Sequence, residues 1–361
     1  MEAFERGLLD TKFEDLKLID ILEAYFQEKL ISKKEEKNLY EWEKEAFFHQ
    51  ILKENQGTAF GSWLQKALET KEFGYRSLSL DYDADREALE KNLLLTAKAV
   101  KSLPYYENHK ERLAFFSSRI SKNPHTFDEG SPCHKLLLYH LMFLFQKNYP
   151  QNAEERAEIY YQAGIIKDDI SNYTTCFGLL AYDKQQIHTG WEGFYKRKEP
   201  MQVSLWNLSE VERITSPFKK VFVVENPTVF SGIIDAIQNL KVSLVCTNGQ
   251  VKLASLILLD KLVEEGFHIY YSGDFDPEGL MIADKLKRRY KENLTLWRYT
   301  KEDYKRALSH EGIAKSRMEK TNKLQDATLI DISLEMQKLK VAGYQELLMT
   351  CFKEDVMRLS V

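Results

Sequence analysis

The sequence predicts a parallel α/β domain that follows a largely helical region. From residue 217 onward, short apolar segments alternate with amphipathic helical segments, the order that gives right-handed crossovers and a parallel sheet. Residues 1 to about 150 instead repeat apolar side chains every three or four positions, with few turn residues, as packed helices do. We therefore expect a helical N-terminal domain over 1–150 and an α/β domain over 217–300, with a distinct module between them.

Composition limits the class of protein. The 361 residues are enough for two or three domains, and 43% apolar with 29% charged residues is ordinary for a globular protein. No apolar run approaches the roughly 18 residues of a membrane span, and the N-terminus lacks a secretory pattern, so we expect a cytoplasmic protein that does not enter a membrane. The net charge of −4 means that binding to DNA would need local basic patches, a metal or a partner. The four cysteines are too scattered to predict a zinc site or a disulfide.

The N-terminal region carries the helical pattern most clearly at 13–26, 87–103 and 135–145. The charged run over 29–45 fits a solvated helix face with ion pairs between residues four apart.

Residues 151–216 have the order helix, helix, hairpin. Asn152 is a suitable N-cap for the first helix, and 167–180 predicts the second. Polar and apolar residues then alternate around Gly190 and Gly193, as in a hairpin. This order is typical of a winged-helix module, which commonly contacts DNA. The wing would carry the basic residues Lys196, Arg197 and Lys198. These would either contact a phosphate backbone or belong to a wing that packs on a neighbouring domain.

The α/β region predicts four strands, over 219–225, 243–249, 268–276 and 294–299. The intervening helices are predicted over 226–240, 251–266 and 277–291, and 301–361 returns to helix that packs on the sheet. Ligands bind such sheets at the carboxyl ends of the strands, where Glu225, Asn248, Asp274 and Asp276 are expected.

Three of these side chains predict a metal site. Asp274 and Asp276 are two residues apart and can leave their strand on the same side, and Glu225 ends another strand. Converging carboxylates repel each other, and a bound Mg²⁺ or Mn²⁺ removes that penalty. Such a metal suits phosphodiester cleavage, because it activates the nucleophile and neutralises charge on the phosphate. Glu278 is either a further ligand or an acid favoured by the start of its helix.

Acidic pairs also follow strands in aspartyl phosphatases and receiver domains. In the phosphatases the pair closes the first strand of the domain, whereas here the strand that ends at Glu225 comes first. The residue after Asp276 is also a proline, which those phosphatases do not use there.

The acids and their spacing resemble a Toprim domain, the metal-binding module of topoisomerases, primases and several nucleases. Glu225 is followed about fifty residues later by the D-x-D-P-x-G of Asp274–Gly279. With a winged-helix pattern directly before it, this form is similar to the A subunit of topoisomerase VI. The segments VVENPTVF, LVCTNGQ, YYSGDFDPEGL and LWRYTKEDY resemble the DUF2399 family, and the helical region before them resembles its usual partner, DUF3323.

That family resembles JetD, the nuclease subunit of Wadjet plasmid-defence systems. The resemblance implies a homodimer that cleaves circular plasmid DNA presented by an SMC-like ATPase complex, with its kleisin-like and small companion subunits. It also implies that Glu225, Asp274 and Asp276 bind a catalytic Mg²⁺ or Mn²⁺.

Two other functions stay open. One is a non-catalytic adapter that binds DNA and the SMC complex. The other is a transesterase like topoisomerase VI, with Tyr160, Tyr161 or Tyr173 as nucleophile, although the resemblance favours hydrolysis and a packing role for these tyrosines. Lys287, Arg288 and Arg289, on the helix after the acids, either steer the DNA backbone or only solvate their helix.

Overall fold

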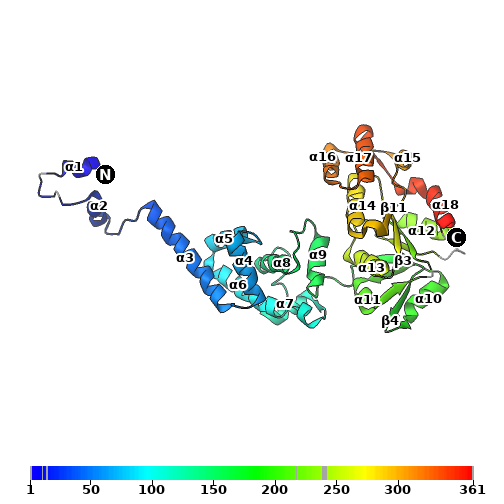
Figure 1. Ribbon diagram of the computed structural model, residues 1–361, viewed down its shortest axis with the longest axis horizontal. Helices are drawn as coiled ribbons and strands as arrows, with labels where there is room; N and C mark the ends of the chain where they lie inside the picture. The colour runs from blue at the N-terminus through cyan, green and yellow to red at the C-terminus, as the bar shows by residue number, and fades with distance from the viewer. Residues whose placement is uncertain (1, 10, 14, 217, 238–241, 360–361) are drawn as a thin grey trace. The chain divides into compact units, whose positions relative to one another are not determined.

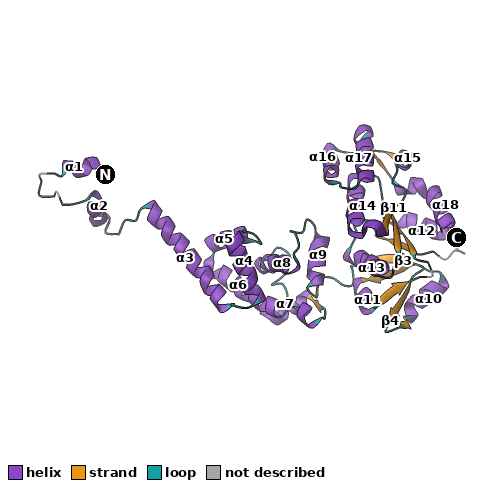
Figure 2. Ribbon diagram, viewed as in Figure 1, coloured by secondary structure: helices purple, strands orange, loops and turns teal. Residues whose placement is uncertain are grey.

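The computed structural model describes residues 2–9, 11–13, 15–216, 218–237 and 242–359 (Figure 1). The chain divides into two compact units, one of Met1–Asn108 with Ala114–Tyr149 and the other of His109–Leu113 with Pro150–Val361. Helices predominate in the first unit, and strands and helices mix in the second (Figure 2). Within the described ranges, no helix is both long and apolar enough to cross a membrane.

The first unit is helical, as the sequence predicts. Its helices are α1 (Glu2–Gly7), α2 (Leu18–Phe26), α3 (Lys33–Glu54), α4 (Ala59–Thr70), α5 (Tyr75–Ala84), α6 (Arg86–Lys101), α7 (Leu113–Ser121) and α8 (Pro132–Phe145). Three of them, α4, α6 and α8, pack on one another and bury Trp63, Leu93 and Leu137. His140 lies in this core edge-on to Trp63, and burial lowers the pKa of its imidazole to about 4, so it packs there as a neutral ring.

The second unit is built on a six-stranded mixed sheet in the order β11-β10-β8-β9-β3-β6. The four predicted strands are present as β8 (Lys220–Val224), β9 (Leu244–Cys246), β10 (His268–Ser272) and β11 (Leu294–Leu296). All three pairings among them are parallel, which confirms the predicted parallel α/β core. Most side chains of β8, β9 and β10 are buried because helices cover the sheet.

The helices between these strands are α12 (Pro227–Ala236), α13 (Leu253–Glu264) and α14 (Pro277–Tyr290). Pro227 and Pro277 each stand in the first turn of a helix, where a missing N–H costs nothing. Two predicted boundaries lie outside the described residues. They are the start of the α/β region at residue 217 and the end of its first helix at 238–240.

The predicted elements over 151–216 are partly wrong. The first helix exists as α9 (Ala153–Gln162), with Asn152 as its N-cap. The second predicted helix is instead strand β3 (Tyr173–Phe177), which pairs antiparallel with β9 and β6 (Met201–Ser204). The reason is tertiary: the β-branched and aromatic sequence YTTCF extends the sheet, and this pairing overrides the helical pattern around it.

The predicted hairpin around Gly190 and Gly193 is also wrong. That stretch forms helix α10 (Thr189–Arg197), where the His188 ring accepts the N–H of Gly190. A hairpin does occur just before it, between β4 (Leu180–Asp183) and β5 (Gln186–Ile187), and β7 (Arg213–Thr215) pairs with β4. Helix α11 (Leu205–Glu210) follows β6. The helix, helix, hairpin order is therefore absent from 151–216.

The C-terminal region is helical and packs on the sheet, as predicted. It contains α15 (Lys301–Arg306), α16 (Lys315–Met318), α17 (Ala327–Leu339) and α18 (Met349–Leu359). An antiparallel pair that the sequence did not predict, β12 (Leu308–Gly312) and β13 (Val341–Gly343), joins its two halves.

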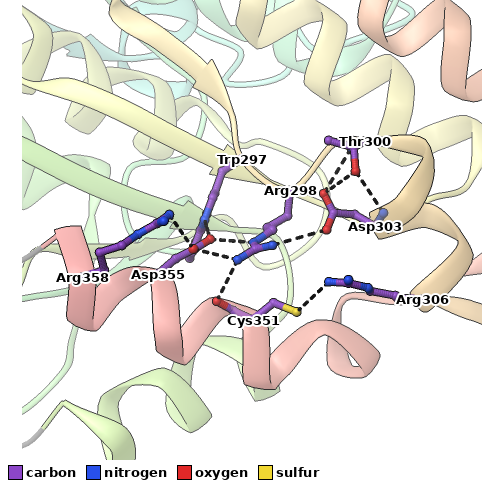
Figure 3. A network of polar contacts seen from close by, with 8 residues as sticks. All are labelled: Trp297, Arg298, Thr300, Asp303, Arg306, Cys351, Asp355 and Arg358. Carbon is purple, nitrogen blue, oxygen red and sulfur yellow. Dashed lines mark hydrogen bonds and ion pairs between the residues drawn. The ribbon is translucent and has the colours of Figure 1, made fainter.

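Asp355 of α18 anchors this region to the end of β11 (Figure 3). Its carboxylate accepts from Trp297 Nε1 at 2.8 Å and from Arg298 Nε at 2.6 Å. Arg298 also lies 3.5 Å from Asp303 of α15, and its backbone is left-handed, with φ 60°. The segment between β11 and α15 is thus fixed from two sides.

Candidate functional site

Glu225 and Asp274 lie at the carboxyl ends of adjacent strands. Val224 of β8 is in register with Ser272 of β10, so Glu225 and Gly273 follow the two strands at the same level. The Asp274 backbone N–H faces Glu225 Oε2 at 3.4 Å. The structure therefore brings together the acids that the sequence placed there, and both are partly buried.

Two tyrosine hydroxyls complete this corner. A methyl group at Gly273 would lie 2.8 Å from Glu225 Oε2, 2.9 Å from the Tyr299 hydroxyl and 3.0 Å from the Tyr271 hydroxyl. Only glycine leaves these three oxygens their space. Both tyrosines are buried, and neither hydroxyl has a hydrogen-bond partner among the described residues. Burial above all raises the pKa of each phenol well above its ordinary value, so both hydroxyls stay protonated beside Glu225.

The anchored segment after β11 explains the position of Tyr299. Trp297 and Arg298 are held by Asp355, and Thr300 caps α15 with its hydroxyl 3.0 Å from the Asp303 N–H (Figure 3). Tyr299 lies between these fixed points, so its ring has little freedom to turn away from Gly273.

The loop that carries the two aspartates is fixed by Phe275. The backbone of Phe275 exchanges two hydrogen bonds of 2.9 Å with Gly343, and its ring is buried against Tyr299 and Tyr304. Because side chains alternate along an extended segment, Asp274 and Asp276 leave on the side opposite Phe275. Asp274 Oδ1 accepts the Gln345 N–H at 2.9 Å, which sets its orientation.

The carboxylates of this corner are short of positive charge. Burial, with help from Asp274 and Asp276, raises the pKa of Glu225 to about 7. Burial likewise raises the pKa of Asp274 to about 6. The negative charges of Glu346 and Asp276 add to this rise, and the hydrogen bond from the Gln345 N–H partly offsets it. No basic side chain among the described residues pairs with Glu225 or Asp274. A bound cation would relieve this repulsion.

Asp276 is differently engaged. Its Oδ1 caps α14 by accepting the Gly279 N–H at 2.7 Å, and its Oδ2 lies 2.6 Å from the Arg317 guanidinium. Gly279 is required because a Cβ there would lie 2.3 Å from the Asp274 carbonyl oxygen. Pro277 and Gly279 thus form the helix entry that fixes the second aspartate.

Glu278 is paired with two bases. Arg317 contacts its Oε2 at 2.6 Å and Lys320 its Oε1 at 2.7 Å. Arg317 above all, together with Lys320, lowers the pKa of this carboxyl to about 2. In this arrangement Glu278 is an ion-paired acid in the first turn of α14, not a free ligand.

Among the described residues, no three or more His, Cys, Asp or Glu side chains are placed to hold a metal ion together. The chemistry of the two free acids nevertheless suits a divalent cation. Glu225 and Asp274 offer hard, partly buried oxygens without a counter-ion, which is the preference of Mg²⁺ and Mn²⁺. The third predicted ligand, Asp276, joins them only if it leaves Arg317. Asn248 ends its strand nearby, but its amide donates to Thr175 Oγ1 and the Cys246 carbonyl.

The basic residues predicted for a wing lie at the end of α10. Lys196 pairs with Glu192 at 2.7 Å and Arg197 with Glu199 at 2.7 Å, and both side chains are exposed. Lys198 is the left-handed C-cap of the helix. These three basic residues therefore lie at a helix end and not on a hairpin, and glutamates neutralise two of them.

The basic residues of α14 are used within the unit. Lys287 donates to the carbonyls of Lys291 and Leu294, and Arg288 pairs with the buried Asp284 at 2.9 Å. Arg289 binds both Asp260 and Glu158. They lie more than ten residues beyond Asp276 along α14, roughly 15 to 20 Å at the helical rise. That distance and these partners separate the three basic side chains from Asp274 and Asp276.

The candidate nucleophilic tyrosines lie in packed positions. Tyr160 is buried in α9, and Lys110 lies over the ring of Tyr161 at 4.5 Å. Lys252 lies over the ring of Tyr173, in β3, at 4.4 Å. These contacts favour a packing role.

Sequence reasoning missed four members of the site, Tyr271, Tyr299, Arg317 and Glu346. Tyr271 stands in the motif YYSGDFDPEGL and Tyr299 in LWRYTKEDY. Their positions within these motifs were the feature of the sequence that could have pointed to them. Arg317 and Glu346 come from the C-terminal region, where no pattern in the sequence points to the site.

Two family models match the chain. The first, described as a protein of unknown function N-terminus (DUF3323), covers residues 1–181, and the second, a protein of unknown function C-terminus (DUF2399), covers residues 201–356. No curated protein matches the chain. The two matches occur in the order that the motifs predict, and the chain belongs to the family of proteins that join a DUF3323 N-terminal region to a DUF2399 C-terminal region.

Proposed function

We propose that this protein is a metal-dependent DNA endonuclease that hydrolyses phosphodiester bonds at Glu225, Asp274 and Asp276. One observation carries the proposal: two partly buried carboxylates at neighbouring strand ends lie beside two buried tyrosine hydroxyls that have no hydrogen-bond partner among the described residues. An acidic cluster alone is common, but unpaired buried donors and uncompensated acids together indicate a missing ligand.

The chain's own groups have distinct tasks in this proposal. Glu225 and Asp274 would hold an Mg²⁺ or Mn²⁺, and Asp276 would join them. When bound, the metal would polarise the phosphate and lower the pKa of an attacking water. The Tyr271 and Tyr299 hydroxyls would donate to Glu225 and orient it. The N-terminus of α14, directly after Asp276, adds a positive helix dipole for the phosphate.

The wider proposal is that the enzyme is a cytoplasmic subunit of an SMC-type anti-plasmid complex. The support is the resemblance of the motifs around Glu225 and Asp274 to a Toprim domain and to the Wadjet nuclease subunit. The parallel order of β8 to β11, with the acids at its carboxyl end, is compatible with a Toprim-like sheet. Circular double-stranded DNA would be the substrate, and two copies of the chain would act together. Copurification with an SMC-like ATPase would test the partner.

The direct test uses the purified protein, supercoiled plasmid and Mn²⁺, with and without that ATPase complex. We expect nicked or linear plasmid from the wild type and none from Glu225→Gln or Asp274→Asn. Glu292→Gln, which neutralises an exposed glutamate outside the site, is the matched control and should cleave as the wild type does. Cleavage by both site variants would refute the proposal.

A second candidate is the non-catalytic adapter. The ion pair between Arg317 and Asp276 favours it, because only Glu225 and Asp274 are then left to bind a metal. DNA binding with no cleavage in Mn²⁺ and the ATPase complex would establish it. A covalent link between DNA and a tyrosine would instead establish the transesterase, for which the packed positions of Tyr160, Tyr161 and Tyr173 give no support.

A further inference from the structure

Arg317 lies beside the candidate site and neutralises two of its acids, Asp276 and Glu278. Its guanidinium reaches Asp276 Oδ2 and Glu278 Oε2, both at 2.6 Å, from the short helix α16. Lys320 adds a second cation at 2.7 Å from Glu278. Two bases thus neutralise two acids at the start of α14, while Glu225 and Asp274 beside them stay without a base among the described contacts.

Only side chains need to move to change this arrangement. Asp284 of α14 is buried and accepts the backbone N–H groups of Gln325 and Asp326, both at 2.8 Å, so the segment after Lys320 is held on α14. The side chains of Arg317 and Lys320 are 40% and 55% exposed, which leaves them free to turn toward solvent.

We propose that Arg317 exchanges partners during substrate binding. Without ligand it holds Asp276, and when Asp276 turns to a divalent cation, Arg317 and Lys320 take a phosphate oxygen of the DNA backbone. This inference rests on the proposed function, since it requires a cation at Glu225 and Asp274. It assigns the phosphate-binding half of the site to the C-terminal region, and it accounts for the absence of three free ligands in the described arrangement.

Charge is the reason for the exchange. When Asp276 turns to a divalent cation, Glu278 alone is left to pair with Arg317 and Lys320, so one positive charge beside the site loses its partner. An arginine released in this way presents a planar fork of donors that suits a phosphate, and the neighbouring lysine adds a point charge. Binding of the divalent cation at the acids and of a DNA phosphate at Arg317 and Lys320 would then favour each other.

The first measurement is the affinity for Mn²⁺ by calorimetry, without DNA. Arg317→Gln removes the competitor for Asp276 and should tighten Mn²⁺ binding about two- to fivefold, the range of an exposed ion pair. Arg317→Lys keeps the charge and should stay closer to the wild type. Arg213→Gln is the matched control, because Arg213 is a half-exposed arginine that pairs with Glu265 of the same unit.

The second measurement is the affinity for a short DNA duplex, with Ca²⁺ in place of Mn²⁺. Arg317→Gln and Lys320→Gln should each weaken binding and lower the slope of its salt dependence by about 1, as the loss of one phosphate contact does. Arg317→Gln should therefore bind Mn²⁺ more tightly and DNA more weakly than the wild type does. A structural role for Arg317 would instead lower the melting temperature and weaken both.

The failures of the two proposals differ. If Mn²⁺ binding is lost in Glu225→Gln but unchanged in Arg317→Gln, the partner exchange is wrong and the metal site stands. If Arg317→Gln binds DNA as the wild type does, the phosphate assignment is wrong. If Glu225→Gln binds Mn²⁺ as the wild type does, or if the wild type binds none, both the proposed function and this inference are wrong.

Discussion

Neutralising Glu225 should stabilise the metal-free protein above neutral pH, which most substitutions at a buried functional residue would not do. Folding raises the pKa of this carboxyl from 4.5 to about 7, because it is buried beside Asp274 and Asp276. The folded state therefore binds the proton more tightly than the unfolded state does. The stability linked to that proton is fully present below about pH 4.5 and is lost as the pH rises through 7.

The size of the effect follows from the shift. Each pKa unit corresponds to about 1.4 kcal/mol, so ionised Glu225 costs at most about 3 kcal/mol of folding free energy at pH 8. Solvent access and coupling to Asp274, whose pKa is also raised, reduce this figure. Glu225→Gln cannot ionise and escapes the cost. In a unit of this size about 1 kcal/mol moves the melting temperature by roughly 2 to 4 °C, so several degrees are expected.

The assay is thermal unfolding in EDTA from pH 5 to pH 8, for the wild type, Glu225→Gln and the control Glu292→Gln. The wild type should lose melting temperature across this range, and Glu225→Gln should lose clearly less. Added Mn²⁺ should raise the melting temperature of the wild type at pH 8 but not that of Glu225→Gln. If wild type and variant fall in parallel, Glu225 carries no uncompensated charge in the folded state and the argument for a cation fails.

Three further substitutions test the geometry. Gly273→Ala places a methyl group 2.8 Å from Glu225 Oε2, and we expect a loss of about 1 to 3 kcal/mol in denaturant unfolding together with weaker Mn²⁺ binding. Asp355→Asn leaves Arg298 without its main partner and should cost about 2 to 4 kcal/mol, with faster proteolysis of α18; unchanged stability would show that the network is dispensable. Arg289→Gln should lower stability without changing the salt dependence of DNA binding, and a smaller salt slope would show that this arginine contacts DNA after all.

The strands of the sheet were predictable because their signal is local. Short runs such as KKVFVVE and HIYYSGDFD are apolar and β-branched or aromatic, and the helices between them have clear starts at Pro227 and Pro277. The parallel order then follows from right-handed crossovers. Those two facts place Glu225 and Asp274 at one edge of the sheet.

The prediction for residues 151–216 was wrong for the opposite reason. Strand β3 exists because two later strands supply its partners, β9 from 67 to 71 residues and β6 from 25 to 31 residues further along the chain. No local pattern records such pairings. Helix α10 forms despite Gly190 and Gly193, which the sequence marks as turn residues.

The sequence by itself determined the residues of the candidate site: the acids, their spacing, the glycine and proline that open α14, and the parallel strands that carry them. These are local features, set by side-chain type and by periodicity. Only the tertiary structure decided how much charge each acid carries. Burial and mutual repulsion leave Glu225 and Asp274 uncompensated, whereas Arg317, distant in the chain, neutralises Asp276 and Glu278. Desolvation and ion pairing depend on distances in space, which the order of residues along the chain does not contain.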